Sequence, residues 1–118
     1  MNIWIPGEFT TLNEYIAAVN ANRYKGAQIK KAETNRVAWE CRGIKPIEKY
    51  PVNIIVTWVR KDRKTDPDNC DFAIKFILDG LQCAGDLKQD TWNCISCITH
   101  KHKVDKDNPG VLIEITGE

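Results

Sequence analysis

The run Val-Asn-Ile-Ile-Val-Thr-Trp-Val, from Val52 to Val59, constrains the fold more than any other part of the chain. β-Branched and aromatic residues fill it, and such residues fit the pleated surface of a sheet. The run leads through the charged segment Arg60–Lys64 into Asn69–Ala84, where apolar side chains recur at helical spacing. Gly85 then stands where helices commonly end in a left-handed glycine. The pattern therefore predicts a strand followed by an amphipathic helix.

Further segments show the pattern of a strand or a helix. Thr10, Thr11 and Asn13 are suitable N-caps for a long helical region. These segments are a strand at Ile3–Ile5, the helical region at Leu12–Cys41 with an interruption in the polar stretch 20–28, and strands at Trp92–His102 and Gly110–Thr116. The order β-α-β-α-β-β predicts an α+β (mixed α/β) fold, in which two helical segments pack on a small mixed sheet.

Composition limits the class of protein. The chain has 118 residues, 42% of them hydrophobic and 28% charged, which predicts one soluble globular domain spanning residues 1–118. The formal net charge is +1, so any nucleic-acid surface must be local. We expect a cytoplasmic protein with no membrane partner, because no signal-peptide pattern and no run of eighteen apolar residues is present. The five cysteines are expected to be buried hydrophobes or free thiols and not a disulfide framework.

The segment Asp66-Pro67-Asp68-Asn69 joins the basic run to the predicted helix. Pro67 favours an extended conformation at Asp66, and carboxylates two residues apart on extended backbone point to the same side. Two such charges are costly together unless a cation lies between them, which predicts a Mg²⁺ or Mn²⁺ site. In the alternative, Asp68 or Asn69 only caps the helix and Asp66 is a turn residue.

The sequence resembles the RusA-type Holliday junction resolvases, which are phage-borne and bacterial endonucleases of branched DNA. The likeness extends in order over nearly the whole chain. The motifs that carry it are Ile5-Pro6-Gly7, Leu12-Asn13-Glu14-Tyr15, Asn22-Arg23-Tyr24, Asp66-Pro67-Asp68-Asn69, the run from Lys75 to Leu81, and Ala84-Gly85 with Asp90 five residues past the glycine. The resemblance implies a homodimeric, divalent-metal-dependent nuclease that cuts opposed strands of a four-way junction.

The resemblance also assigns roles to single residues. It implies that Asp66, Asp68 and Asp90 bind Mg²⁺ or Mn²⁺ and that Lys75 is the catalytic lysine. A lysine in that place would contact the scissile phosphate and offset its negative charge. Asp79 matches a recurrent helix acid, and Asp86 competes with Asp90 for the third acidic position. We prefer Asp90, because its offset from Gly85 matches the family.

Two basic clusters could contact DNA phosphates. One lies between residues 23 and 36, and the other is the Arg60–Lys64 run. The residues we expect to contact nucleic acid are Asn13, Tyr15, Arg23, Tyr24, Lys30, Lys31, Arg60, Arg63 and Lys64. The alternatives are a solvated helix face and strand end for the charges, and core packing in place of base stacking for the two tyrosines.

The sequence allows two other interpretations, one of a metal site and one of the function. Cys94, Cys97, His100 and His102 have ligand types that suit Zn²⁺, but an extended strand would place Cys97 opposite the other three. A second function is a non-catalytic dimer of the same fold that binds branched DNA without cutting it. Binding that needs no divalent metal is common to both functions, whereas cleavage with Mg²⁺ or Mn²⁺ belongs to the nuclease alone.

Overall fold

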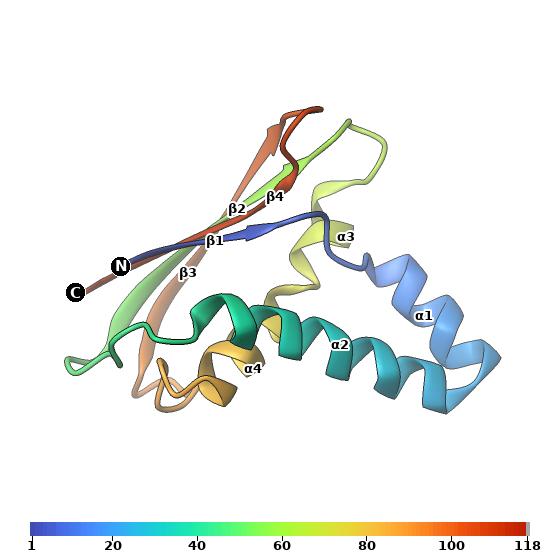
Figure 1. Cartoon of the computed structure of the whole chain (residues 1–118). Helices are drawn as coiled ribbons and strands as arrows, with labels where there is room; N and C mark the ends of the chain where they lie inside the picture. The colour runs from blue at the N-terminus through green and yellow to red at the C-terminus, as the bar shows by residue number, and fades with distance from the viewer. Residues whose placement is uncertain (118) are drawn as a thin grey trace.

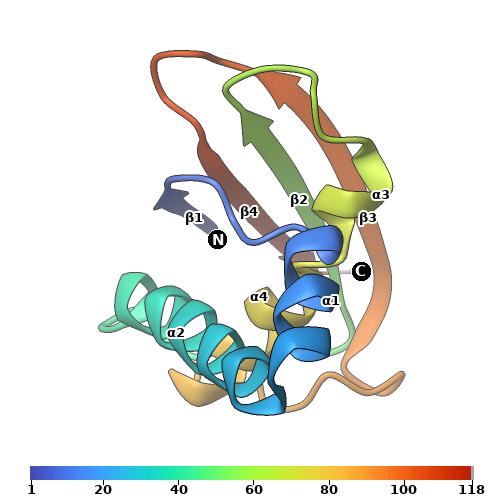
Figure 2. The ribbon, with the colours of Figure 1, turned by 90° about the vertical axis from the view of Figure 1, so that its right-hand side faces the viewer.

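The fold is built on a mixed sheet with helices on one of its faces (Figures 1 and 2). A computed structural model describes residues 1–117, and within them four strands pair in the order β1-β4-β2-β3. The strands are β1 (Asn2–Pro6), β2 (Val52–Arg60), β3 (Ile95–Val104) and β4 (Gly110–Gly117). The helices are α1 (Leu12–Ala21), α2 (Arg23–Cys41), α3 (Pro67–Asp71) and α4 (Ile74–Cys83). This arrangement confirms the predicted α+β class and the predicted order of elements.

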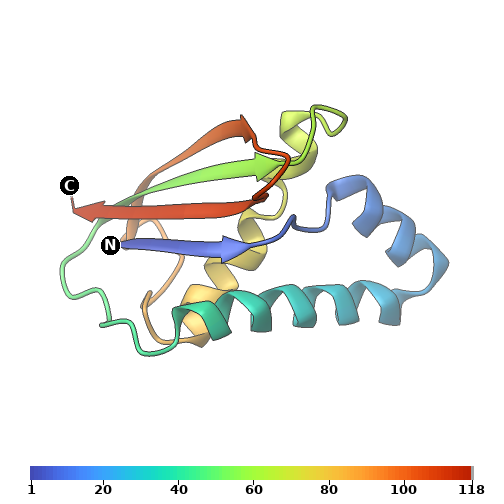
Figure 3. The same ribbon diagram turned by 45° about the horizontal axis from the view of Figure 1, so that its top comes forward.

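Strand β2 lies inside the sheet, as its continuous apolar run requires. It pairs in parallel with β3 and antiparallel with β4, so both of its edges are hydrogen-bonded. A parallel pair needs a long crossover, and here the crossover carries α3 and α4. The carboxyl ends of β2 and β3 therefore lie side by side, next to the start of α3 (Figure 3).

The core lies between the sheet and the helices. Strand β2 buries Val52, Ile54, Val56 and Trp58, while helix α4 buries a face that includes Phe76. Helix α2 packs closely on α4, because a Cβ at Gly80 would meet the side chain of Val37 and lie 3.0 Å from the carbonyl oxygen of Thr34. In the described part of the chain, no helix is both long and apolar enough to span a membrane.

The first helical region is interrupted within the stretch 20–28, as predicted, and the break lies at Asn22. Asn22 is extended, and its side-chain oxygen accepts a hydrogen bond from the backbone N–H of Tyr24 at 2.8 Å. Thr11 is the N-cap of α1 and forms a capping box with Glu14. Of the three expected caps, Thr11 takes the role. The turn between α1 and α2 extends away from the sheet (Figures 1 and 3).

The predicted single helix over Asn69–Ala84 is wrong. The structure has the short α3, then Phe72 and Ala73, then α4. At the break the backbone hydrogen bonds tighten to three-residue spacing, from Ala73 to the Cys70 carbonyl oxygen at 3.1 Å and from Phe76 to the Ala73 carbonyl oxygen at 3.0 Å. The centre of the Phe72 ring lies there 5.1 Å from that of Tyr15 on α1. Gly85 follows α4 with a φ of +86°, as its place after the helix predicts.

The strand predicted over Trp92–His102 begins later and ends later. The carbonyl oxygen of Thr91 accepts hydrogen bonds from the N–H groups of Cys94 and Ile95, both at 2.9 Å. This turn keeps Trp92 out of the sheet, so β3 starts at Ile95. The last predicted strand is confirmed as β4. The cysteines are free thiols, as expected: Cys41, Cys70 and Cys94 are buried, and Cys83 and Cys97 are exposed.

Candidate functional site

Asp66 and Asp68 lie at the start of α3, just beyond the end of β2. Asp66 is extended, with φ −65° and ψ 150°, as the following proline predicts. It occupies the N-cap position, yet its carboxylate makes no capping hydrogen bond. The carboxylate of Asp68 accepts a hydrogen bond from the backbone N–H of the adjacent Asn69 at 3.0 Å. Neither Asp68 nor Asn69 is the N-cap, and both aspartates are exposed to solvent.

A cavity of about 540 Å³ opens where the carboxyl ends of β2 and β3 meet α3. Asp66 lines it together with Arg60, Arg63, His102 and Lys103. Clefts at the carboxyl ends of parallel strands are common ligand sites in α/β proteins. The cavity therefore holds one predicted acidic residue beside two predicted DNA-contacting arginines.

A chain of alternating charges links α2, α4 and the loop that follows α4. The Nζ of Lys75 lies 3.1 Å from a carboxylate oxygen of Asp79 and 3.4 Å from one of Asp90. The Nζ of Lys30 on α2 lies 3.9 Å from the other oxygen of Asp79. Hydrogen bonding to Asp79 raises the pKa of Lys75 above its ordinary value of 10.5, with a smaller contribution from Asp90. Lys75 is therefore a stable cation at neutral pH.

The structure separates the two candidates for the third acidic position. Asp86 is 1% exposed, and burial raises its pKa above the ordinary value of 3.8. Its partner is the thiol of Cys41, whose pKa is raised to about 12, first by burial and then by the charge of Asp86. The side chain of Asp90 is 33% exposed and touches Lys75. Asp90 is therefore the residue that can reach a ligand in solvent.

The three expected metal ligands are not gathered. Within residues 1–117, no group of three or more His, Cys, Asp or Glu side chains is placed to hold a metal ion. Asp66 lines the cavity beside β2, whereas Asp90 lines a different cavity of about 560 Å³. Carboxylate oxygens suit Mg²⁺ chemically, but these side chains do not form the site as they are placed.

Within residues 1–117, Cys94, Cys97, His100 and His102 do not form a Zn²⁺ site either. Cys94 is buried ahead of β3, and Cys97 is exposed on the strand. His100 and His102 have partners of another kind. The Nε2 of His102 donates to a carboxylate oxygen of Asp71 at 2.7 Å, and the Nδ1 of His100 accepts a hydrogen bond from the indole N–H of Trp58 at 2.9 Å.

The residues expected to bind DNA fall into two groups. Arg60 and Tyr15 have structural partners. Arg60 pairs with Glu8 at 3.4 Å and donates to the Phe9 carbonyl oxygen and to Thr65, while the ring of Tyr15 packs on Phe72. The others are exposed to solvent: Asn13, Arg23, Tyr24, Lys30, Lys31, Arg63 and Lys64. For Tyr15 the core-packing alternative is therefore the observed one.

The contact between Asp71 and His102 was not predicted from the sequence. It ties α3 to β3 across an interval of 31 residues. The alternation His100-x-His102 could have indicated that both rings face the same side of the strand. No signal in the sequence marks Asp71 as their partner.

These contacts define a polar surface on α4 and the loop around Asp90, which presents Lys75 between two carboxylates beside Lys30 of α2. Asp66 and Asp68 are exposed separately, at the start of α3. Such groups can bind a phosphodiester and neutralise its charge. No model of a known protein family matches the chain, and no curated protein matches it either.

Proposed function

We propose that this protein is a structure-selective endodeoxyribonuclease that resolves Holliday junctions or related branched DNA by hydrolysing phosphodiesters. The proposal includes a homodimer, because two sites related by a twofold axis suit the cutting of two opposed strands. It also includes dependence on Mg²⁺ or Mn²⁺, with Asp66, Asp68 and Asp90 as the ligands. A divalent ion, when bound, would supply water activation and charge neutralisation.

The observation that carries the proposal is the contact between Lys75 and Asp90. These residues are fifteen positions apart, and the family resemblance implies that both belong to one site. Their side chains meet at 3.4 Å, and the acidic competitor Asp86 is buried elsewhere. A lysine whose charge is stabilised by Asp79 can bind a scissile phosphate and offset its growing negative charge. Exposed Arg23, Lys30 and Lys31 would hold flanking phosphates.

A second candidate function is a dimer of the same fold that binds branched DNA without cutting it. One observation favours it: within residues 1–117 the acidic side chains are not grouped to hold a metal ion. Under the nuclease proposal, Asp90 must move toward Asp66 and Asp68 when DNA and metal bind, so that the three carboxylates can hold one ion. Under the alternative, the carboxylates stay apart and the basic residues alone engage the DNA.

Cleavage of a synthetic four-way junction distinguishes the two. The wild-type protein and Asp68→Asn are incubated with the junction, with Mg²⁺ or with a chelator, and the products are separated on a denaturing gel. We expect paired, symmetrical nicks for the wild type with Mg²⁺ and loss of nicking in Asp68→Asn. Binding should remain in the variant, or improve, because a charge that repels phosphates is gone.

Asp107→Asn is the matched control, since Asp107 is an exposed aspartate in the turn between β3 and β4. It should cut like the wild type. Equal junction binding with and without Mg²⁺, and no nicks under any condition, would support the non-cutting dimer in place of the nuclease. A protein that sediments as a monomer at working concentration would contradict the paired-cut mechanism.

A further inference from the structure

Trp92 is an exposed aromatic residue beside the proposed site. Its side chain is 96% exposed, and it lies two residues after Asp90 in the segment between α4 and β3. Tryptophan is usually well buried, because its large apolar surface favours removal from water. An indole that is 96% exposed therefore needs a reason other than stability.

Two of the other three tryptophans are held by neighbours. Trp58 is 2% exposed, packs against Phe9 and His100, and donates its indole N–H. Trp39 is 62% exposed, but the guanidinium of Arg42 lies 3.6 Å from its ring centre. In the described part of the chain, Trp92 takes part in no ring contact or hydrogen bond. The fold does not use this side chain.

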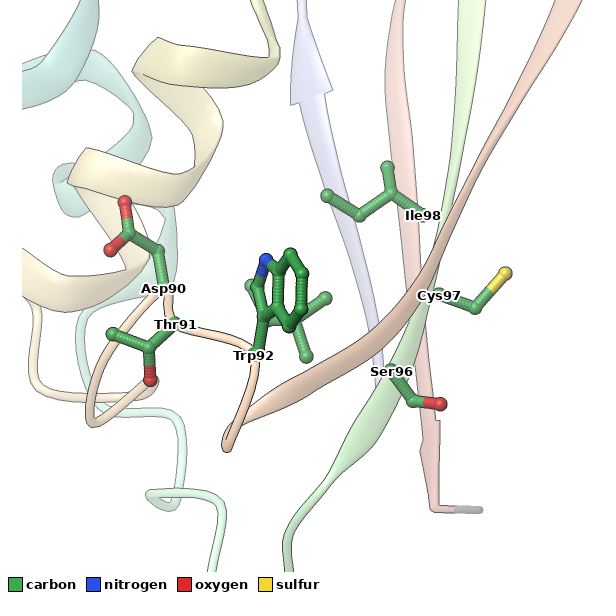
Figure 4. A pocket seen from close by; sticks show the side chains of 7 residues that line it. Asp90, Thr91, Trp92, Ser96, Cys97 and Ile98 are labelled. Atoms are coloured by element: carbon green, nitrogen blue, oxygen red, sulfur yellow. The ribbon is translucent and has the colours of Figure 1, made fainter.

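Trp92 stands at the edge of the cavity of about 560 Å³ that Asp90 also lines. Figure 4 shows the indole between the loop that carries Asp90 and Thr91 and the strand β3. Ile98, itself 38% exposed, points from β3 toward the same space, while Cys97 points away from it. The cavity thus has an aromatic wall, an apolar wall and an acidic residue at one end.

The position of Asp90 indicates what could occupy this cavity. The carboxylate of Asp90 touches Lys75, the residue proposed to bind the scissile phosphate, and the backbone of the same residue leads directly to Trp92. Asp90 therefore lies between Lys75, which it contacts, and the cavity that Trp92 lines. Base stacking on an aromatic ring tolerates every sequence, because each base has a π-face. A base that leaves the stack at a branch point can therefore stack on such a ring.

We propose that Trp92 stacks on an unpaired nucleobase of branched DNA, with Ile98 as the opposite apolar wall. This inference rests on the proposed function and adds the feature by which the protein distinguishes a branch point from a continuous duplex. In a continuous duplex the base is stacked on its neighbours, so Trp92 contributes little to binding. Trp92 is a positioning residue and takes no part in the chemical step.

The test compares binding of a four-way junction and of a linear duplex of matched sequence. Fluorescence anisotropy with chelator present gives the Kd for wild type, Trp92→Ala, Trp92→Phe and the control Trp39→Ala. We expect Trp92→Ala to weaken junction binding about tenfold, within the range measured for base–aromatic stacking, and to leave duplex binding unchanged. Trp92→Phe should recover most of the affinity, and Trp39→Ala should match the wild type on both DNAs.

Three outcomes overturn the inference. One is wild-type junction affinity in Trp92→Ala, and another is equal loss of affinity for junction and duplex. The third is loss of the dimer together with binding in Trp92→Ala, measured by sedimentation, which would place the indole against a second copy of the chain. If the wild type binds neither DNA, the proposed function itself fails. Because the side chain is exposed, thermal unfolding should be unchanged in both Trp92 variants.

Discussion

At the scale of single residues, environment separates side chains that the sequence makes equivalent. Asp86 and Asp90 follow the same helix and differ by four positions, yet one is 1% exposed beside Cys41 and the other touches Lys75. Burial penalises the charged carboxylate, which raises the pKa of Asp86, whereas Asp90 keeps its contact with solvent and a cation. The two aspartates therefore have different uses, one inside the fold and one at the surface.

Replacement of Asp86 should change how stability depends on pH. Because the pKa of Asp86 is raised above 3.8 in the folded protein, the unfolded chain releases this proton at a lower pH. The folded state therefore loses stability as pH rises from about 3.8 through the raised value. Asp86→Asn removes this dependence. The urea midpoint of the variant minus that of the wild type should therefore rise as pH is raised from about 3.5 to about 7. A constant difference across that range, or the same gain in the control Asp107→Asn, would contradict the assignment.

Two arginines of the basic clusters show the same effect of environment. Arg36 donates to the carbonyl oxygens of Pro6, Gly7 and Glu8, with its guanidinium over the ring of Phe9 at 4.1 Å. Arg60 is held by Glu8, the Phe9 carbonyl oxygen and Thr65. The planar fork of arginine suits such multiple contacts. These two charges fasten the segment after β1, and they should not be counted as free phosphate contacts.

At the scale of elements, the short helix α3 depends on β3 for its position. Five residues make too few helical hydrogen bonds for independent stability. The hydrogen bond between His102 and Asp71, at 2.7 Å, holds the end of α3 against the strand. Since α3 carries Asp68 and follows Asp66, this contact also sets where both carboxylates lie.

Removing this contact should loosen α3 without unfolding the protein. A hydrogen bond to a charged group contributes about 1.5 kcal/mol, which corresponds to roughly tenfold faster local opening. In His102→Ala we expect amide hydrogen exchange to rise by about that factor in residues 67–72 and to stay unchanged in α4. Lys101→Ala is the control, because the adjacent side chain points to the opposite face of β3. Unchanged exchange in α3 would show that other contacts hold the helix.

At the scale of the whole molecule, the balanced charge hides a local basic surface. The formal net charge is +1, and several basic residues are paired internally. Exposed Arg23 and Lys31 lie on α2, the helix that also carries Lys30 beside Asp79. Under the proposed function, a DNA strand bound at Lys75 would therefore continue along α2.

This arrangement predicts the salt dependence of DNA binding. Each phosphate contact contributes about 0.9 to the slope of log K against log salt concentration. In Arg23→Ala/Lys31→Ala the slope should fall by roughly 1.8, because two contacts are lost. The double variant Lys45→Ala/Lys49→Ala removes equal charge from the exposed segment between α2 and β2 and should keep the wild-type slope. Equal slopes for all three proteins would remove α2 from the DNA-binding surface.

Much of the architecture could be predicted because its signals are local. The apolar run from Val52, the cap at Thr11 and the glycine at position 85 each specify a nearby backbone conformation, and all three are confirmed. The errors have two sources. At Phe72, where the predicted helix is interrupted, the ring packs against Tyr15 of a distant element, and at Thr91 a local turn without a Gly or Pro signal delays the start of β3.

For the candidate site too, the sequence determined some features and the tertiary structure determined others. Residue type, spacing and the family resemblance identified Asp66, Asp68, Lys75 and Asp90 as the groups suited to phosphodiester chemistry, and that assignment stays a prediction. Tertiary structure decided that Lys75 meets Asp90, that Asp86 is buried, and that Asp71 is tied to His102. The physical reason is that helix and strand signals act over a few residues, whereas the meeting of side chains depends on how whole elements pack. The sequence therefore indicated which side chains are candidates for the site, and the packing of α3, α4 and β3 decided where those side chains lie.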